Sequence, residues 1–144
     1  MREALDFMRQ IADGLDEAHG AGIIHRDLKP DNLFLVEGKG GFQVKILDFG
    51  VAKLLLPEMQ SGERTATGLI MGTPAYMSPE QASGEVHSIG PASDVYALAI
   101  IVYRMLSGRL PIEGEFVPQI LLKHISEPPT PISRFLPDFP VHVW

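Results

Sequence analysis

Cysteine is absent from the chain, which excludes disulfide bonds, thiolate nucleophiles and cysteine-ligated zinc. Long apolar runs are also absent: the longest, residues 95–103, has nine residues and is too short to span a bilayer. Basic residues are scarce, with 12 Lys and Arg against 18 Asp and Glu and a net charge of −6. This charge argues against nucleic acid as a partner, because phosphate backbones attract basic surfaces. We therefore expect a soluble, cytoplasmic chain with no membrane segment.

The overall composition is that of an ordinary globular domain. The 144 residues are 45% apolar and 21% charged, which is enough to build one buried core. Near the N-terminus, six apolar residues fall on a single helical stripe and predict an amphipathic helix; they are Leu5, Met8, Ile11, Ala12, Leu15 and Ala18. Gly20 and Gly22 follow, and glycine favours the left-handed turn that ends a helix.

Two short runs of strand-forming residues, 33–36 and 42–47, flank a glycine-rich turn at 37–41 and predict a β-hairpin. The glycine cluster does not match a phosphate-binding loop. Such a loop opens a helix with Lys-Ser or Lys-Thr at its end, whereas this cluster leads into another strand.

The second half of the chain predicts helices separated by loops. Residues 48–80 lack periodicity, as functional loops and disordered segments do. Ser93 is expected to cap a helix over residues 95–106 that is buried on all sides and ends at Gly108. A second helix is expected over residues 116–125, followed by a proline-rich loop at 127–140.

The sequence HRDLKPDN at residues 25–32 carries side chains suited to phosphoryl transfer. That reaction needs an oriented nucleophile and neutralised phosphate charge more than covalent help from the protein. Asp27 is placed to accept the proton of an incoming hydroxyl, and Lys29 to reach the transferred phosphate. Asn32 offers an oxygen ligand suited to Mg²⁺, and Asp48, 16 positions later (48 − 32) in an Asp-Phe-Gly, offers a second.

Each of these motifs alone has an ordinary structural explanation. A single His-Arg-Asp is compatible with a solvated turn, and a single Asp-Phe-Gly carries little information. Two further motifs follow, however: GTPAYMSPE at residues 72–80 and SDVYALA at residues 93–99. Coincidence does not explain all four in this order.

Together the four motifs resemble the catalytic domain of the protein kinases. Lys29 and Thr73 are marks of serine/threonine rather than tyrosine kinases, and MSPEQ at residues 77–81 resembles the bacterial-type (Hanks-type) branch. The resemblance covers nearly the whole chain. It implies that residues 1–144 are a partial kinase catalytic domain, covering most of its large (C-terminal) lobe.

The implied fold is α+β and mainly helical: a kinase C-lobe with a small β-hairpin beside the catalytic loop and an activation segment at residues 48–80. In this family His25 and Phe49 pack into a hydrophobic column. By the same resemblance, Asp94 hydrogen-bonds the backbone of the catalytic loop. We expect these three residues to have structural roles.

The resemblance also implies an activity, the transfer of the ATP γ-phosphoryl group to Ser or Thr hydroxyls of protein substrates. ATP and Mg²⁺, or Mn²⁺ in its place, would be the cofactors. Asp27 and Lys29 would be catalytic; Lys29, Asn32 and Asp48 would hold the nucleotide, the last two through the metal. Thr73 and Tyr76, with their neighbours Met77 and Pro79, would form the surface that receives the substrate.

Regulation by phosphorylation is a further expectation. Kinases with an arginine before the catalytic aspartate, here Arg26, are often switched by a phosphate that pairs with it and orders the activation loop. Thr65 and Thr67 stand where bacterial relatives carry such phosphates. An activating kinase acting in trans would then be a partner. The alternative is an ordinary polar loop.

The sequence begins on the helix before the catalytic loop, so we expect the small lobe, which grips the nucleotide, to be absent. Two hypotheses follow. One is a kinase represented by part of its catalytic domain; the other is a catalytically silent fragment or pseudokinase-like interaction module. We expect the isolated chain to transfer phosphate poorly. We also expect Glu80 to lack its family partner, an arginine beyond residue 144.

Overall fold

The computed structural model describes residues 2–38, 41–49 and 74–139. Within these ranges the chain is mainly helical, with one two-stranded antiparallel sheet. In chain order the elements are α1 (Arg2–Gly20), β1 (Leu33–Gly38), β2 (Gly41–Ile46), α3 (Pro79–Ser83), α4 (Pro91–Ser107) and α5 (Val117–Ser126). Short 3-10 turns lie at Pro30–Asn32, Pro74–Tyr76, Val86–Ser88 and Ile132–Arg134. This content agrees with the predicted fold class.

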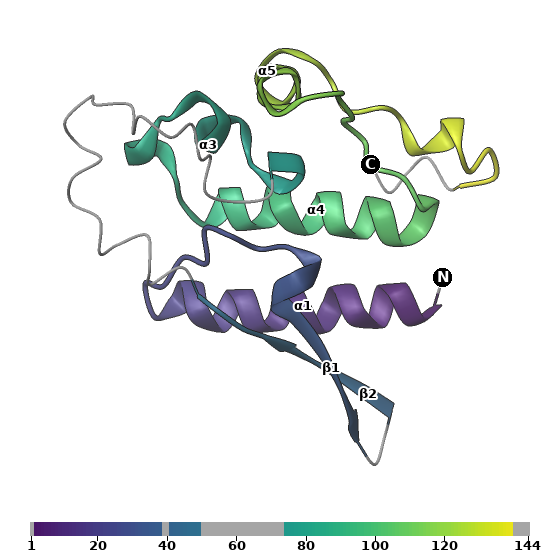
Figure 1. Cartoon of the computed structure of the whole chain (residues 1–144). Coiled ribbons are helices and arrows are strands. Elements are labelled where there is room, and N and C mark those ends of the chain that lie inside the picture. The colour runs from purple at the N-terminus through teal and green to yellow at the C-terminus, as the bar shows by residue number, and fades with distance from the viewer. Residues whose placement is uncertain (1, 39–40, 50–73, 140–144) are drawn as a thin grey trace.

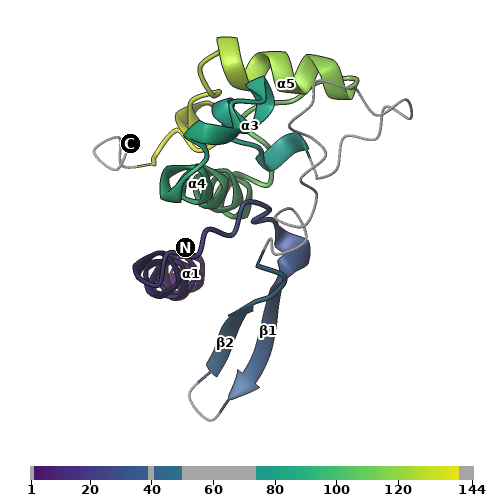
Figure 2. The ribbon, with the colours of Figure 1, turned by 90° about the vertical axis from the view of Figure 1, so that its left-hand side faces the viewer.

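Helices α1 and α4 run side by side and hold the core between them (Figures 1 and 2). Ile11 and Leu15 of α1 are almost completely buried, as is Ile101 of α4. Leu28 from the loop before β1 and Tyr76 from the segment before α3 join the same cluster. The core therefore fixes the position of the loop that follows α1.

Helix α1 ends at Gly20, as predicted, and Gly22 follows in the left-handed conformation with φ of 76°. The predicted apolar stripe is only partly buried. Leu5 is 46% exposed and Ala12 is also exposed, whereas Ile11 and Leu15 pack against α4. Ala12 follows Ile11 by about 100° around the helix, which turns it away from the helix seam.

The predicted hairpin is present, two residues longer at the end of β1 and shifted by one residue in β2. Its register pairs Leu33 with Ile46 and Gly38 with Gly41. Gln10 of α1 ties the hairpin down: its side-chain oxygen accepts from Val44 N–H at 2.8 Å and its nitrogen donates to the Phe42 carbonyl at 3.2 Å.

Helix α1 also approaches the hairpin closely at Gly14. A Cβ at this position would lie 3.1 Å from Ile46 Cδ1. The small residue therefore lets the end of β2 lie directly against α1.

Helix α4 begins earlier than predicted. Its N-cap is Gly90, and Ser93 is the third helical residue, whose Oγ accepts from Gly90 N–H at 3.2 Å. The prediction mistook the N3 member of a capping box for the cap itself. The helix is also not buried on all sides, because Val95 is 57% and Met105 is 39% exposed.

The remaining predicted elements are close to those observed. Helix α5 begins one residue later than predicted, at Val117, with Phe116 as its N-cap. The proline-rich tail is irregular apart from the turn Ile132–Arg134. Across the described residues, no helix combines the length and apolar character needed to cross a membrane.

Candidate functional site

Asp94, in the first turn of α4, anchors the loop between α1 and β1; this side chain is 1% exposed. Its Oδ2 accepts from His25 N–H and its Oδ1 from Arg26 N–H, both at 2.8 Å. His19, in the last turn of α1, places Nε2 2.8 Å from the same Oδ2. The predicted contact between Asp94 and the catalytic-loop backbone is thus confirmed, and His19 is an addition that sequence reasoning missed.

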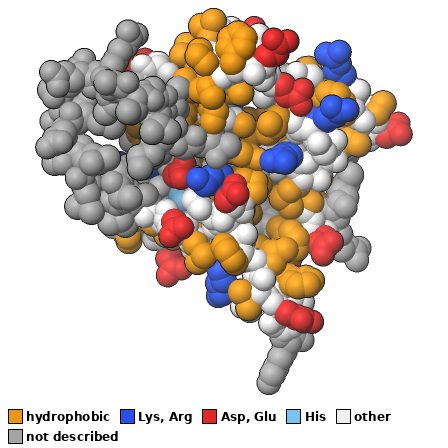
Figure 3. Space-filling view, viewed as in Figure 1, with side chains coloured by type: hydrophobic (Ala, Val, Ile, Leu, Met, Phe, Trp, Pro, Cys, Tyr) orange, Lys and Arg blue, Asp and Glu red, His pale blue; other side chains and the backbone are white. Residues whose placement is uncertain are grey.

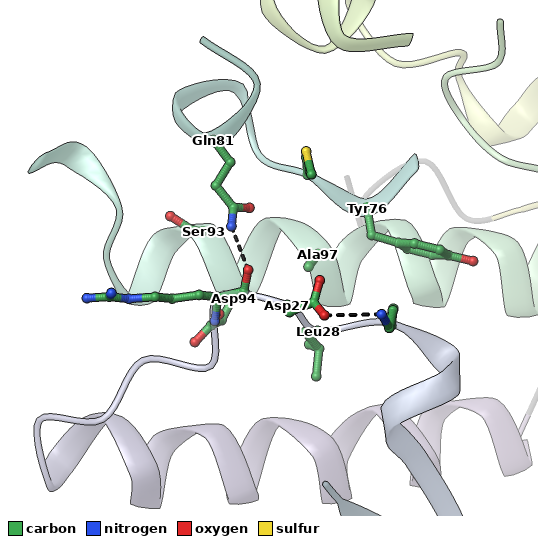
Figure 4. A pocket seen from close by; sticks show the side chains of 10 residues that line it. Asp27, Leu28, Tyr76, Gln81, Ser93, Asp94 and Ala97 are labelled. Atoms are coloured by element: carbon green, nitrogen blue, oxygen red, sulfur yellow. Dashed lines mark hydrogen bonds and ion pairs between the residues drawn. The ribbon is translucent and has the colours of Figure 1, made fainter. Parts of the chain in front are cut away.

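Arg26 has a left-handed backbone, with φ of 65°, although it is not glycine. For a residue with a Cβ this conformation costs on the order of 1–2 kcal/mol. Both polar groups of its backbone are held: the N–H by Asp94, and the carbonyl oxygen by Gln81 Nε2, which donates at 2.6 Å. Figure 4 shows Gln81 reaching down from α3 to the loop that carries Asp27.

Asp27, Lys29 and Asn32 converge, as predicted. Lys29 Nζ lies 3.1 Å from Asp27 Oδ2, and Asn32 Nδ2 donates to the Asp27 carbonyl at 2.9 Å. Asn32 is only 7% exposed, so this bond fixes its orientation. Because the amide nitrogen is used, the amide oxygen is the end of the side chain that can face a cation.

Asp48 returns to this loop at the end of the hairpin. Its neighbour Leu47 donates its N–H to the Asn32 carbonyl at 2.8 Å, which extends the pairing of β1 and β2 by one step. The Leu47 carbonyl oxygen lies 3.0 Å from His25 Nε2. Asp48 itself is exposed and left-handed, with φ of 55°. Asp48 therefore directly follows the residue whose backbone is hydrogen-bonded to Asn32.

His25 and Phe49 pack together, as the predicted structural role requires. His25 is completely buried, and its ring centroid lies 4.9 Å from that of Phe49. This contact adds a second connection between the catalytic loop and the segment after β2.

The donors at this site fit a metal that shares its coordination with phosphate and water. In the described part of the chain, no three His, Cys, Asp or Glu side chains are grouped closely enough to hold a metal. The Asn32 amide and the Asp48 carboxylate are hard oxygen donors. Mg²⁺ is commonly bound by one or two such groups together with nucleotide phosphates, so these residues fit it.

On the other side of Asp27, a small pocket of mixed polar and apolar character lies between the catalytic loop, the start of α4 and the segment before α3 (Figure 4). Tyr76 lines it and is 5% exposed, so it contributes from within the wall. Its hydroxyl accepts from Arg104 Nη1 at 2.5 Å.

Three predicted site residues, Thr65, Thr67 and Thr73, lie outside the described residues.

Glu80 has a hydrogen-bond partner within this chain. Ser93 Oγ donates to its Oε1 at 2.5 Å. Partial burial would raise the pKa of Glu80, but hydrogen bonds from Ser93, its own backbone and Ser78 outweigh that effect and hold the pKa below its ordinary value. The arginine expected as the family partner lies beyond residue 144, and within the described residues the Ser93 hydroxyl on α4 donates a hydrogen bond to the carboxylate.

Gln81 and His19 had no recognised role in the sequence. The pattern Ser-x-x-Gln at residues 78–81 is a capping box, which signals the start of α3 and nothing about Arg26. Contacts between residues 55 positions apart, as for Gln81 and Arg26, follow from the tertiary fold alone.

Comparison with known proteins places this geometry in a family. A family model described as "Protein kinase domain" matches residues 1–136. The chain is 42% identical over 140 residues, 97% of its length, to serine/threonine-protein kinase pkn2 of Myxococcus xanthus. It is 44% identical over 143 residues, 99% of its length, to serine/threonine-protein kinase PknA of Mycobacterium tuberculosis.

A second Myxococcus xanthus protein, serine/threonine-protein kinase Pkn1, is 46% identical over 131 residues, 90% of the chain. These matches cover 16%, 30% and 18% of the respective relatives, so the chain corresponds to a minor part of each. The family model nevertheless spans the catalytic loop, both strands and α3 to α5. The chain belongs to the protein kinase domain family.

Proposed function

We propose that the chain supplies the catalytic loop and metal ligands of a serine/threonine protein kinase, as part of the large lobe with its activation segment at residues 48–80. One observation carries the proposal: partly buried contacts join Asp27 to both Lys29 and Asn32, and a backbone bond from Leu47 to Asn32 brings the neighbouring Asp48 to the same loop. The names of the relatives support Ser and Thr as acceptors. The site would act on cytoplasmic proteins.

In the proposed reaction, the acceptor hydroxyl oxygen forms a bond to the ATP γ-phosphorus while the bond to the β–γ bridging oxygen breaks and ADP leaves. Asp27 orients the hydroxyl and receives its proton. Lys29, 3.1 Å from the Asp27 carboxylate, neutralises charge on the transferred group. Mg²⁺, when bound by Asn32 and Asp48, would offset the charge of the phosphates.

The left-handed backbone at Arg26 and the bonds to Asp94 bear on this chemistry because they fix where Asp27 leaves the loop. Misplacement of a catalytic group by about 1 Å lowers rates by roughly a hundredfold.

Thr73 and Tyr76 are proposed to receive the substrate. Thr65 and Thr67 are proposed as sites phosphorylated in trans, and Arg26 as the side chain that pairs with the added phosphate.

The test is transfer of labelled phosphate from ATP to a generic basic protein in the presence of Mg²⁺, followed by identification of the phosphorylated amino acid. Because the 144 residues alone are expected to transfer poorly, the assay uses them joined to a kinase small lobe. Asp27→Asn should lower transfer at least a hundredfold. Asp31→Asn, an exposed aspartate in the same loop, is the matched control and should stay within twofold. Equal transfer by wild type and Asp27→Asn, or label on tyrosine alone, would refute the proposal.

A catalytically silent interaction module is the second candidate. The observation that favours it is one face of the hairpin, where Leu35 and Phe42 are each about half exposed; the similarly exposed Phe34 lies on the opposite face. Exposed apolar side chains that share a face are typical of a surface that another protein segment covers. In this case wild type would show no transfer above Asp27→Asn, while substitution of Leu35 and Phe42 by Ser would abolish binding to a partner.

A further inference from the structure

The side chain of Gln81 makes two separable sets of hydrogen bonds. Its oxygen Oε1 accepts from Ser78 N–H at 3.1 Å and from Ser78 Oγ at 3.3 Å, which caps α3. Its nitrogen Nε2 donates to the Arg26 carbonyl at 2.6 Å. One amide therefore connects the beginning of α3 to the residue that precedes Asp27.

Gln81 and Asp94 together hold both polar groups of the Arg26 backbone. Asp94 already holds the N–H of Arg26 at 2.8 Å, so Gln81 closes the other side of the same left-handed residue. A backbone in this conformation persists only when its surroundings enforce it. Rotation about Arg26 would redirect Asp27, because Asp27 is the next residue along the chain.

We propose that Gln81 is a positioning residue for Asp27. It locks the Arg26 carbonyl and thereby links the geometry of the catalytic loop to residues 74–83, the end of the activation segment and the start of α3. The inference deepens the proposed kinase function and rests on it for its kinetic consequence. Its structural part, the lock on Arg26, is independent of activity.

Gln81→Glu separates the two sets of bonds. A glutamate retains an oxygen that can accept from Ser78, and glutamate at this position is a standard capping-box residue. It replaces the donor that faces the Arg26 carbonyl by a carboxylate oxygen, which repels it. Ser78→Ala is the matched control, because it removes the Oγ bond of the cap and leaves the Gln81 amide in place.

The first measurement is by NMR on the 144-residue chain. In the wild type, the Gln81 side-chain amide protons should exchange with solvent more slowly than those of the exposed Gln43. Gln81→Glu should shift the backbone amide signals of Arg26 and Asp27, and Ser78→Ala should leave them in place. Equal exchange of the two glutamines overturns the proposal without any variant, even where Gln81→Glu fails to fold.

The second measurement is kinetic, on a form of the protein that passes the transfer test. Gln81→Glu should lower kcat at least tenfold while the KM for ATP stays within twofold, and Ser78→Ala should leave both within twofold. A parallel loss in the two variants would assign Gln81 to the helix cap alone. Failure of the kinase proposal would show as absent wild-type transfer, while the NMR result would still decide whether Gln81 locks Arg26.

Discussion

Replacement of Asp94 by Asn should destabilise the fold far more than its small change in shape suggests. The carboxylate is 1% exposed and accepts from three groups: the N–H of His25, the N–H of Arg26 and Nε2 of His19. Hydrogen bonds to a charged group contribute about 1.5–3 kcal/mol each. The amide keeps one oxygen acceptor and turns an NH₂ group toward remaining donors, so at least one bond is lost and its partner is left buried.

We expect Asp94→Asn to lower the free energy of unfolding by about 3 kcal/mol. Against a typical total of about 5–15 kcal/mol, this raises the unfolded fraction roughly a hundredfold. The assay is urea denaturation at pH 7 followed by far-ultraviolet circular dichroism. Asp13→Asn is the control, because its side chain is 66% exposed and pairs with Arg9 on the same helix.

The control should change stability by less than about 0.5 kcal/mol, as exposed i,i+4 ion pairs do. A loss below 1 kcal/mol for Asp94→Asn, or equal losses in both variants, would refute the reasoning. It would mean that the loop backbone does not depend on the buried carboxylate.

Three further predictions concern the packing and charges around the site. Ser93→Ala should lower the free energy of unfolding by about 1–3 kcal/mol at pH 7. The difference from wild type should shrink as the pH falls through the lowered pKa of Glu80, because protonation ends the bond from Ser93 to the carboxylate. A difference in unfolding free energy that stays constant with pH would contradict this. His124 is buried, and burial lowers its pKa. The free energy of unfolding should therefore fall as the pH drops below about 6.5, because the unfolded chain takes up the proton first. His124→Leu should show a smaller decline in the denaturation midpoint between pH 7.5 and 5.5. Ile11 is 1% exposed, so Ile11→Ala should lower the free energy of unfolding by about 2–5 kcal/mol in thermal or urea denaturation. Leu5 is 46% exposed, so Leu5→Ala should lower it by less than about 1 kcal/mol. Similar losses in the two variants would place the core elsewhere.

Local patterns predicted the elements of this fold well. The stripe around Ile11 and Leu15 gave the first helix, and Gly20 gave its end. Alternation around a glycine-rich turn gave the hairpin. The error at the start of α4 arose because serine is common both as the N-cap and at the third helical position. Ser93 occupies the third position, and its hydroxyl accepts from the N–H of Gly90, which is the N-cap.

The catalytic loop was predicted from its residue types and order, and the structure brings Asp27, Lys29 and Asn32 together accordingly. Of the supporting contacts, the bonds from Asp94 and the packing of His25 against Phe49 were predicted and the others were not. His19 and Gln81 have no local pattern that points to the loop, since their partners lie 75 and 55 positions away. The left-handed backbone of Arg26 was equally hidden, because arginine carries no preference for it.

The central claim is that Asn32 and Asp48 bring a metal-bound nucleotide to Asp27. The most direct measurement is paramagnetic broadening of backbone amide signals by Mn²⁺–ATP. We predict selective broadening of Asn32, Leu33, Leu47 and Asp48, with α5 unaffected, and loss of the effect in Asp48→Asn but not in Asp31→Asn. Broadening that is absent, that centres on another part of the chain, or that survives Asp48→Asn unchanged would contradict the account.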